Sequence, residues 1–168
     1  MTPAARVQAA IECLDLVLAA AREGGAAADT VIQRYFAARR YAGSKDRRAV
    51  RDLVFDVIRS VGEPPPTGRS ALIGHARARA PDLLAHFGAD GHAPAAIVPD
   101  ELSARTGLAP PWLMRKLRER FAAAAGAEVA ALLGRAPLDL RVNRLKAGRD
   151  DMLGQWPGAV ATARAPDG

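Results

Sequence analysis

The chain has 168 residues, enough for one domain with a sizeable core and part of a second. Hydrophobic residues make up 49% of the chain and aromatic residues only 5%, which favours closely packed helices and argues against a β-sandwich. The net charge of +6 favours a polyanionic partner, with nucleic acid preferred over an anionic membrane surface. A bland alternative is a basic composition set by codon usage in a GC-rich genome.

The cysteine content and the hydrophobic runs indicate the compartment. One cysteine, Cys13, excludes an internal disulfide framework and favours a reducing environment. No apolar run approaches the ~20 residues of a membrane span. The N-terminus lacks the basic region, apolar core and cleavage site of a signal peptide. We therefore expect a cytoplasmic protein without a membrane partner.

The first 36 residues predict two helices. Thr2 and Pro3 form a good helix start, and an apolar stripe follows as far as Leu18, before Gly24 and Gly25. Asp29 is the expected cap of a second helix that runs through Phe36. Cys13 lies off the apolar stripe with no base nearby, so we expect it to have no catalytic role.

Residues 39–62 form the most informative stretch. Ser44 is the predicted N-cap of a helix and Gly62 its left-handed stop. Apolar residues recur at helical spacing on one face, and mostly basic residues fall on the other. Residues 34–59 hold eight basic and three acidic residues, a net charge of +5 against +6 for the whole chain. Because the excess charge is clustered in one stretch, codon usage is a poor explanation of the basic composition. The predicted buried stripe is Val50, Val54, Val57 and Val61.

The basic residues of this stretch are the main candidates for a binding site. An antiparallel pair of helices joined by a short Gly-Ser turn would bring them to one corner. Arginine suits bidentate contacts to phosphate, and phosphate contacts would position an RNA. The predicted phosphate-binding residues are Arg39, Arg40, Lys45, Arg47, Arg48 and Arg51.

The middle of the chain predicts short helices and loops. Helices are expected at 68–80, 81–87, 102–107, 111–121 and 128–133, with a loop at 88–99. Trp112 is expected to be a packing wedge at a helix start, although it could stack on a base. His75, His86 and His92 lack the spacing and companions of metal ligands, so no metal is expected.

From residue 137 the hydrophobic period changes from helical to alternating. Residues 138–142 predict a half-buried strand, 149–156 a short helix and 159–164 a second strand. Two strands and a helix cannot bury a core, so this α+β tail is expected to be incomplete. Secondary candidates for RNA contact lie here, namely Arg141, Asn143, Arg144 and Lys146.

Two segments resemble one protein family. The run YAGSKDRRAVRDLVFDVIR resembles the signature helix of the NusB-like RNA-binding domain of RsmB-type (Sun or Fmu) ribosomal RNA 5-methylcytosine methyltransferases. The run PLDLRVNRLKAGRDDML, residues 137–153, and the Pro-Trp-Leu helix start are similar to segments of the same family. The resemblance implies a NusB-like helical bundle at 1–134 and the start of an RRM-like subdomain at 135–168.

The resemblance also implies a function. The expected role is to bind small-subunit ribosomal RNA and present a cytosine to a catalytic domain. That domain uses S-adenosylmethionine and two catalytic cysteines in the family. This chain has no GxGxxG cradle and only Cys13, which matches neither cysteine motif, so we expect a truncated and inactive chain.

Two other interpretations stay open. A NusB-type transcription antitermination factor would share the fold but leave 135–168 as an unexplained extension. A helical protein–protein adaptor would use the basic face to bind an acidic partner.

Overall fold

The structure is a computed structural model that describes residues 1–134, 136, 138–163 and 165. Most of these residues lie in helices, so the predicted mainly α class is confirmed. The chain forms two compact units, Met1–Leu133 and Gly134–Gly168. The helices are α1 (Pro3–Arg22), α2 (Ala28–Ala37), α3 (Ser44–Ser60), α4 (Gly68–Arg79), η1 (Pro81–His86, 3-10), α5 (Pro111–Phe121), η2 (Ala122–Ala124, 3-10), α6 (Ala125–Leu133) and α7 (Arg149–Gln155).

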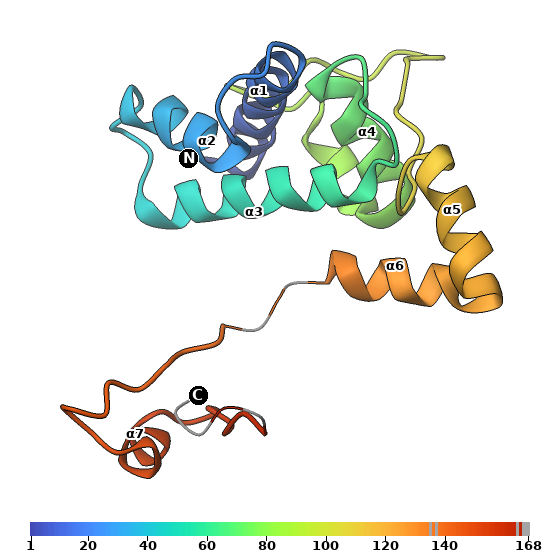
Figure 1. The fold of residues 1–168 in the computed structure, drawn as a ribbon. Helices are drawn as coiled ribbons and strands as arrows, with labels where there is room; N and C mark the ends of the chain where they lie inside the picture. Colours follow the sequence, from blue (N-terminus) through green and yellow to red (C-terminus); the bar gives the residue numbers. More distant parts are fainter. Residues whose placement is uncertain (135, 137, 164, 166–168) are drawn as a thin grey trace. The chain divides into compact units, whose positions relative to one another are not determined.

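The core of the first unit forms where α1, α2 and α4 pack on the same side of α3 (Figure 1). Val50, Val54 and Val57 are completely buried in it, as the spacing predicts. Val61 lies just beyond the helix and is only partly buried. Burial of an aliphatic side chain stabilises the fold by ~1.5–3 kcal/mol. The three valines therefore fix which face of α3 turns to solvent.

The start of α4 is fitted closely against α1. A Cβ at Gly68 would lie 2.5 Å from the carbonyl oxygen of Ile11, so only glycine fits there. The backbone N–H of Gly68 donates to Asp15 Oδ1 at 2.6 Å. Thr67 and Ser70 complete the turn with a reciprocal capping box. These contacts hold α1 and α4 together on the buried side of α3.

Three predicted helix boundaries are wrong. The N-cap of α3 is Gly43, and Ser44 is already the first helical residue. The N-cap of α2 is Ala27, so Asp29 lies inside the first turn. Gly62 is not a left-handed stop, because its φ is not positive. At the two helix starts the predicted residue is of a good capping type, but the chain enters the helix one or two residues before it.

The end of α3 is set by a tertiary contact instead. Val61 is extended and forms an isolated antiparallel bridge with Thr106, and the N–H of Gly107 donates to the carbonyl of Ser60 at 2.9 Å. A Cβ at Gly62 would lie 3.1 Å from the carbonyl oxygen of Ala109. The helix predicted at 102–107 is therefore wrong, because this segment pairs with the end of α3.

The helices α5 and α6 pack against each other, with Val129 buried. Trp112, at the start of α5, is 57% exposed, so the expected packing wedge is wrong. The ammonium of Lys116, one turn further on, lies 5.9 Å from its ring centre. More than half of the Trp112 surface is therefore open to solvent, beside a cation of its own helix.

The second unit contains the predicted helix, α7, but not the β-α-β arrangement. No strand is assigned at the described residues of 138–142 or 159–163, and Leu138 and Val160 are more than 80% exposed. No described backbone hydrogen bond joins these two segments. Two strands without further partners cannot bury both faces of a sheet. Of the tail's predicted residues, 135, 137, 164 and 166–168 lie outside the described residues.

Candidate nucleic-acid interface

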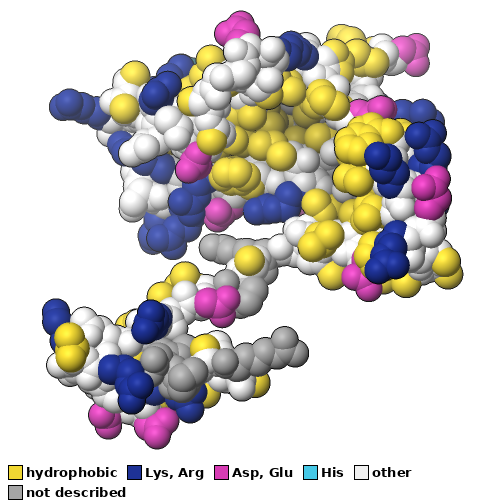
Figure 2. Space-filling view, in the orientation of Figure 1, with side chains coloured by type: hydrophobic (Ala, Val, Ile, Leu, Met, Phe, Trp, Pro, Cys, Tyr) yellow, Lys and Arg dark blue, Asp and Glu magenta, His cyan; other side chains and the backbone are white. Residues whose placement is uncertain are grey.

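The outer face of α3 carries the excess charge. Because the valine stripe is buried, the opposite side of the helix exposes Lys45, Arg48 and Asp52. Figure 2 shows Lys and Arg side chains gathered at the end of the first unit where α2 leads into α3. We call one group of exposed cations here the basic corner: Arg40, Lys45, Arg47, Arg48 and Arg51.

Most of the basic corner is not neutralised within the described part of the chain. The side chains of Arg40, Lys45 and Arg48 make no hydrogen bond or ion pair with described residues. Arg51 has one distant carboxylate, Asp52, at 3.8 Å on the exposed surface. A pair of this kind contributes little in water. These side chains therefore remain available for an external anion.

The acidic residue that lies between Lys45 and Arg47 in the sequence pairs with groups of the N-terminal segment instead. Asp46 pairs with the N-terminal ammonium of Met1 at 3.0 Å and with Arg6 Nε at 2.8 Å. Hydrogen bonds from these two groups lower the pKa of the Asp46 carboxyl below its ordinary value. The carboxylate faces α1, so it does not offset the cations on the outer face of α3.

Arg47 is partly fixed by the protein itself. Its Nε donates to the carbonyl of Ala42 at 2.8 Å, and its guanidinium carbon lies 6.0 Å from the centre of the Phe36 ring. The stem thus covers apolar surface at the edge of the core. The guanidinium keeps further donors for a second partner.

Arg39 differs from the other candidates. Its guanidinium lies over the Tyr35 ring at 3.7 Å and pairs with Glu12 of α1 at 3.3 Å. The same arginine donates to the carbonyl of Tyr35 at 3.2 Å. Arg39 therefore binds α2 to α1, and its charge is already partly satisfied.

A groove runs between α2 and α3 beside the basic corner. It has a volume of about 510 Å³. Each helix contributes residues at the spacing i, i+3, i+4, i+7, which marks one face of a helix. We call it the α2–α3 groove: Asp29, Ile32, Gln33 and Phe36 line it from α2, and Ser44, Arg47, Arg48 and Arg51 from α3.

Sequence reasoning found the arginines of this groove but not its other wall. Asp29 and Gln33 lie on an exposed face of a helix. Two polar residues at such positions usually contact only water and have no functional role. The signal that could have revealed this wall is the identical i, i+3, i+4, i+7 spacing of two sets of residues, 29, 32, 33 and 36 on one helix and 44, 47, 48 and 51 on the next. It becomes informative only once the two helices are known to pack together.

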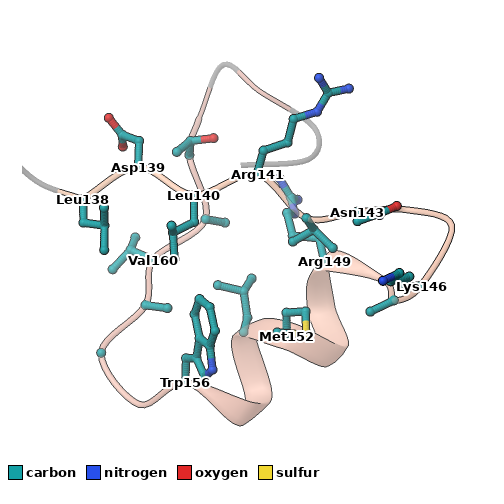
Figure 3. A pocket seen from close by; sticks show the side chains of 17 residues that line it. Leu138, Asp139, Leu140, Arg141, Asn143, Lys146, Arg149, Met152, Trp156 and Val160 are labelled. Carbon is teal, nitrogen blue, oxygen red and sulfur yellow. The ribbon is translucent and has the colours of Figure 1, made fainter.

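The candidates in the second unit surround a separate apolar groove of about 760 Å³. In Figure 3 the side chains of Leu138 and Leu140 point toward α7, whereas Asp139 points the other way. The predicted alternation is therefore present without a paired strand. Leu138, Leu140, Val142, Met152, Trp156 and Val160 line the groove, together with Arg141, Asn143 and Lys146.

The polar candidates of this unit differ in their roles. Asn143 Oδ1 accepts from the N–H of Leu145 at 3.1 Å, and its carbonyl accepts from Lys146 and Ala147. This is a local turn, which accounts for the asparagine without a ligand. Arg141 and Arg144 are exposed, and both line a smaller hollow of about 400 Å³.

Comparison with known proteins adds one finding. Residues 109–167 match the family model described as the ferredoxin-like domain of RsmF/B-like methyltransferases. This segment is similar to that family. The match covers about a third of the chain, from the loop before α5 to the tail. No curated protein and no solved structure matches the chain.

The match begins well before the predicted domain boundary at 134/135. It includes α5 and α6, which belong to the first unit. It does not include the basic corner or the α2–α3 groove. The boundary at 134/135 and the NusB-like character of residues 1–134 therefore stay predictions.

The described residues do not fit an S-adenosylmethionine cradle. Such a site needs a strand followed by a glycine-rich turn and a helix, and no strand is assigned among them. Cys13 is completely buried, and burial raises the pKa of its thiol to about 12. No chemical step is therefore assigned to this part of the chain.

The described part of the chain has no cluster of metal ligands and no membrane-spanning helix. No group of three or more His, Cys, Asp and Glu side chains there could hold a metal ion. None of the helices there combines the length and apolar character needed to cross a membrane.

Proposed function

We propose that this chain binds structured RNA through the basic corner, as the RNA-binding part of a small-subunit ribosomal RNA 5-methylcytosine methyltransferase. The observation that carries the proposal is the set of exposed cations on α3 and the preceding loop, which the described residues leave largely unneutralised. Of the two acidic residues next to these cations in sequence, Asp46 is turned toward α1, and Asp52 makes only a weak, exposed pair with Arg51. Such a patch attracts phosphates at long range and positions them at short range.

The spacing of the cations suits a phosphate backbone. Arg47, Arg48 and Arg51 follow one face of α3, and Lys45 and Arg40 continue the charge toward its N-terminus. Arginine forks pair with phosphate oxygens through two hydrogen bonds. The tail residues Arg141, Asn143, Arg144 and Lys146 would add contacts, although Asn143 already has a local partner.

The similarity of residues 109–167 supports the methyltransferase context. An antitermination factor of the NusB type would leave that segment unexplained, so we place it second. An adaptor for an acidic protein remains the third interpretation. In the first role the chain would be cytoplasmic and would present a ribosomal RNA cytosine to a catalytic domain that uses S-adenosylmethionine.

RNA and protein partners are separated by one experiment. The tagged chain is captured from a lysate in two portions, one of them treated with ribonuclease, and the bound molecules are identified. RNA that co-purifies and is lost after ribonuclease treatment supports the proposal. An acidic protein that survives the treatment would contradict it and favour the adaptor. Ribosomal RNA in the captured pool would favour the methyltransferase role over the antitermination factor.

A further inference from the structure

The α2–α3 groove is suited to an unpaired nucleotide. Its volume of about 510 Å³ falls within the ~300–1,000 Å³ of ordinary ligand pockets. Its floor includes the buried rings and chains of Ile32 and Phe36, and its walls are polar. A groove between two helices cannot admit a duplex, but a base turned out of an RNA loop or bulge can enter one.

The two walls carry opposite charge. Arg47, Arg48 and Arg51 line the α3 side, and Asp29 lines the α2 side. Asp29 forms no ion pair with any of them within the described residues. The carboxylate and the guanidinium groups therefore face the groove without neutralising one another.

Asp29 retains hydrogen-bonding capacity. Its Oδ1 accepts the backbone N–H of Thr30 at 2.8 Å and lies 3.5 Å from the Thr30 hydroxyl. Neither contact uses Oδ2. An ionised carboxylate only accepts hydrogen bonds, at about four lone-pair sites. Gln33, one turn further along the same face of α2, brings an amide that both donates and accepts.

These groups select among the bases by chemistry. Guanine presents two neighbouring donors on its Watson–Crick edge, N1–H and the N2 amino group, which match the two oxygens of a carboxylate. Uracil presents one donor, N3–H, between two carbonyl oxygens. A carboxylate repels these oxygens because both carry negative charge. Inosine is guanosine without the N2 amino group. Guanidinium planes also offer surfaces on which a base can stack.

We propose that the α2–α3 groove takes one unpaired guanine of the bound RNA, read by Asp29, while the arginines of α3 hold its phosphates. The inference rests on the proposed function, because it needs RNA at the basic corner. Phosphate contacts alone carry no sequence information, so the guanine site would give the basic corner a preference for one base.

The test uses three fluorescent RNA hairpins that differ only at one unpaired position of a uridine loop, which is guanosine, inosine or uridine. Anisotropy titrations with the full chain give the affinity for each. Wild type binds the guanosine strand about tenfold more tightly than the uridine strand, the size of a good two-bond base contact, and inosine falls between them. Asp29→Asn binds all three alike, and a circular dichroism melt confirms that it is folded.

Asp52→Asn is the matched control, because it removes one carboxylate from exposed α3 outside the groove lining. It keeps the guanosine preference. Equal binding of all three strands by wild type, with steep salt dependence, overturns the guanine site and leaves the RNA-binding proposal standing. A guanosine preference that survives in Asp29→Asn also overturns it. Salt-independent or absent binding of every strand overturns the proposed function and this inference together.

Discussion

The guanidinium carbon of Arg39 lies 3.7 Å from the centre of the Tyr35 ring, and Arg39 and Tyr35 share one carboxylate oxygen of α1. Tyr35 Oη donates to Glu12 Oε2 at 2.7 Å, and Arg39 Nη2 donates to the same atom at 3.3 Å. Burial, followed by the bond to Glu12, raises the pKa of Tyr35. Arg39 is therefore mainly a structural residue.

Arg39→Ala is expected to lower the free energy of unfolding by about 1 kcal/mol, because it removes a cation–π contact and a partly exposed ion pair. The slope of RNA affinity against salt should change little. Arg48→Ala, the matched control, should leave the thermal melt unchanged and reduce that slope by about 1. Urea titration and salt-dependent anisotropy measure the two quantities. A stable Arg39→Ala variant with a reduced slope would return Arg39 to the phosphate-binding set.

His75 gives a pH-dependent prediction. It is 7% exposed, and its Nδ1 lies 2.9 Å from Ser60 Oγ, which itself donates to the carbonyl of Val57 at 2.8 Å. The hydroxyl hydrogen is used there, so Nδ1 carries the proton that bonds to Ser60. Burial lowers the pKa of His75, with Asp56 opposing and Arg79 reinforcing the shift.

The unfolded chain therefore takes up a proton near pH 6.5 that folded His75 resists. Stability should be at its full value above that pH and fall as the pH drops toward the folded pKa. His75→Gln should show a shallower fall between about pH 7.5 and about pH 5.5, about one unit either side of the free-histidine value. Urea unfolding at a series of pH values checks this. Parallel pH profiles for the two proteins would contradict the assignment.

The tail is expected to contribute little to the stability of the first unit. Residues 138–163 have exposed apolar side chains and no described strand pairing. Deleting residues 138–168 should shift the melting temperature by less than about 2 °C, and amide protons of the tail should exchange quickly. Calorimetry and hydrogen exchange measure these. A large loss of stability would make the tail an integral layer of the core.

The chain is expected to bind no S-adenosylmethionine and to transfer no methyl group. The described residues form no cradle for the cofactor, and the thiol of Cys13 is buried with a raised pKa. Calorimetric titration with S-adenosylmethionine should give no binding heat. Micromolar affinity would show that a cofactor site exists which the residue pattern does not reveal.

The helical class and the orientation of α3 were predictable from sequence because they depend on periodicity. Val50, Val54 and Val57 share one face in any α-helix, and a face of valines is buried wherever a core is available. α7 and the start of α5 at Pro111 were likewise predictable from local signals.

The remaining features depend on contacts between distant segments. The end of α3 is set by Val61 pairing with Thr106, which no local pattern announces. Arg39 and Arg48 are both arginines of one basic stretch, yet Glu12 forms an ion pair with Arg39 and no described carboxylate forms one with Arg48. The α2–α3 groove exists only because two faces of equal spacing meet. The alternating tail had the right side-chain directions but lacked a partner strand.

The most direct test of the account is the salt dependence of RNA binding in a charge-matched pair of variants. For about four to five phosphate contacts, log affinity should fall with log salt at a slope of about −4. Arg47→Ala/Arg48→Ala should reduce the slope by about 2 while the circular dichroism melt shows that the protein is folded. Arg118→Ala/Arg120→Ala removes the same charge from exposed positions on α5, and its slope should stay near −4. An unchanged slope in the folded Arg47/Arg48 variant, or an equal change in both variants, would contradict binding at the basic corner.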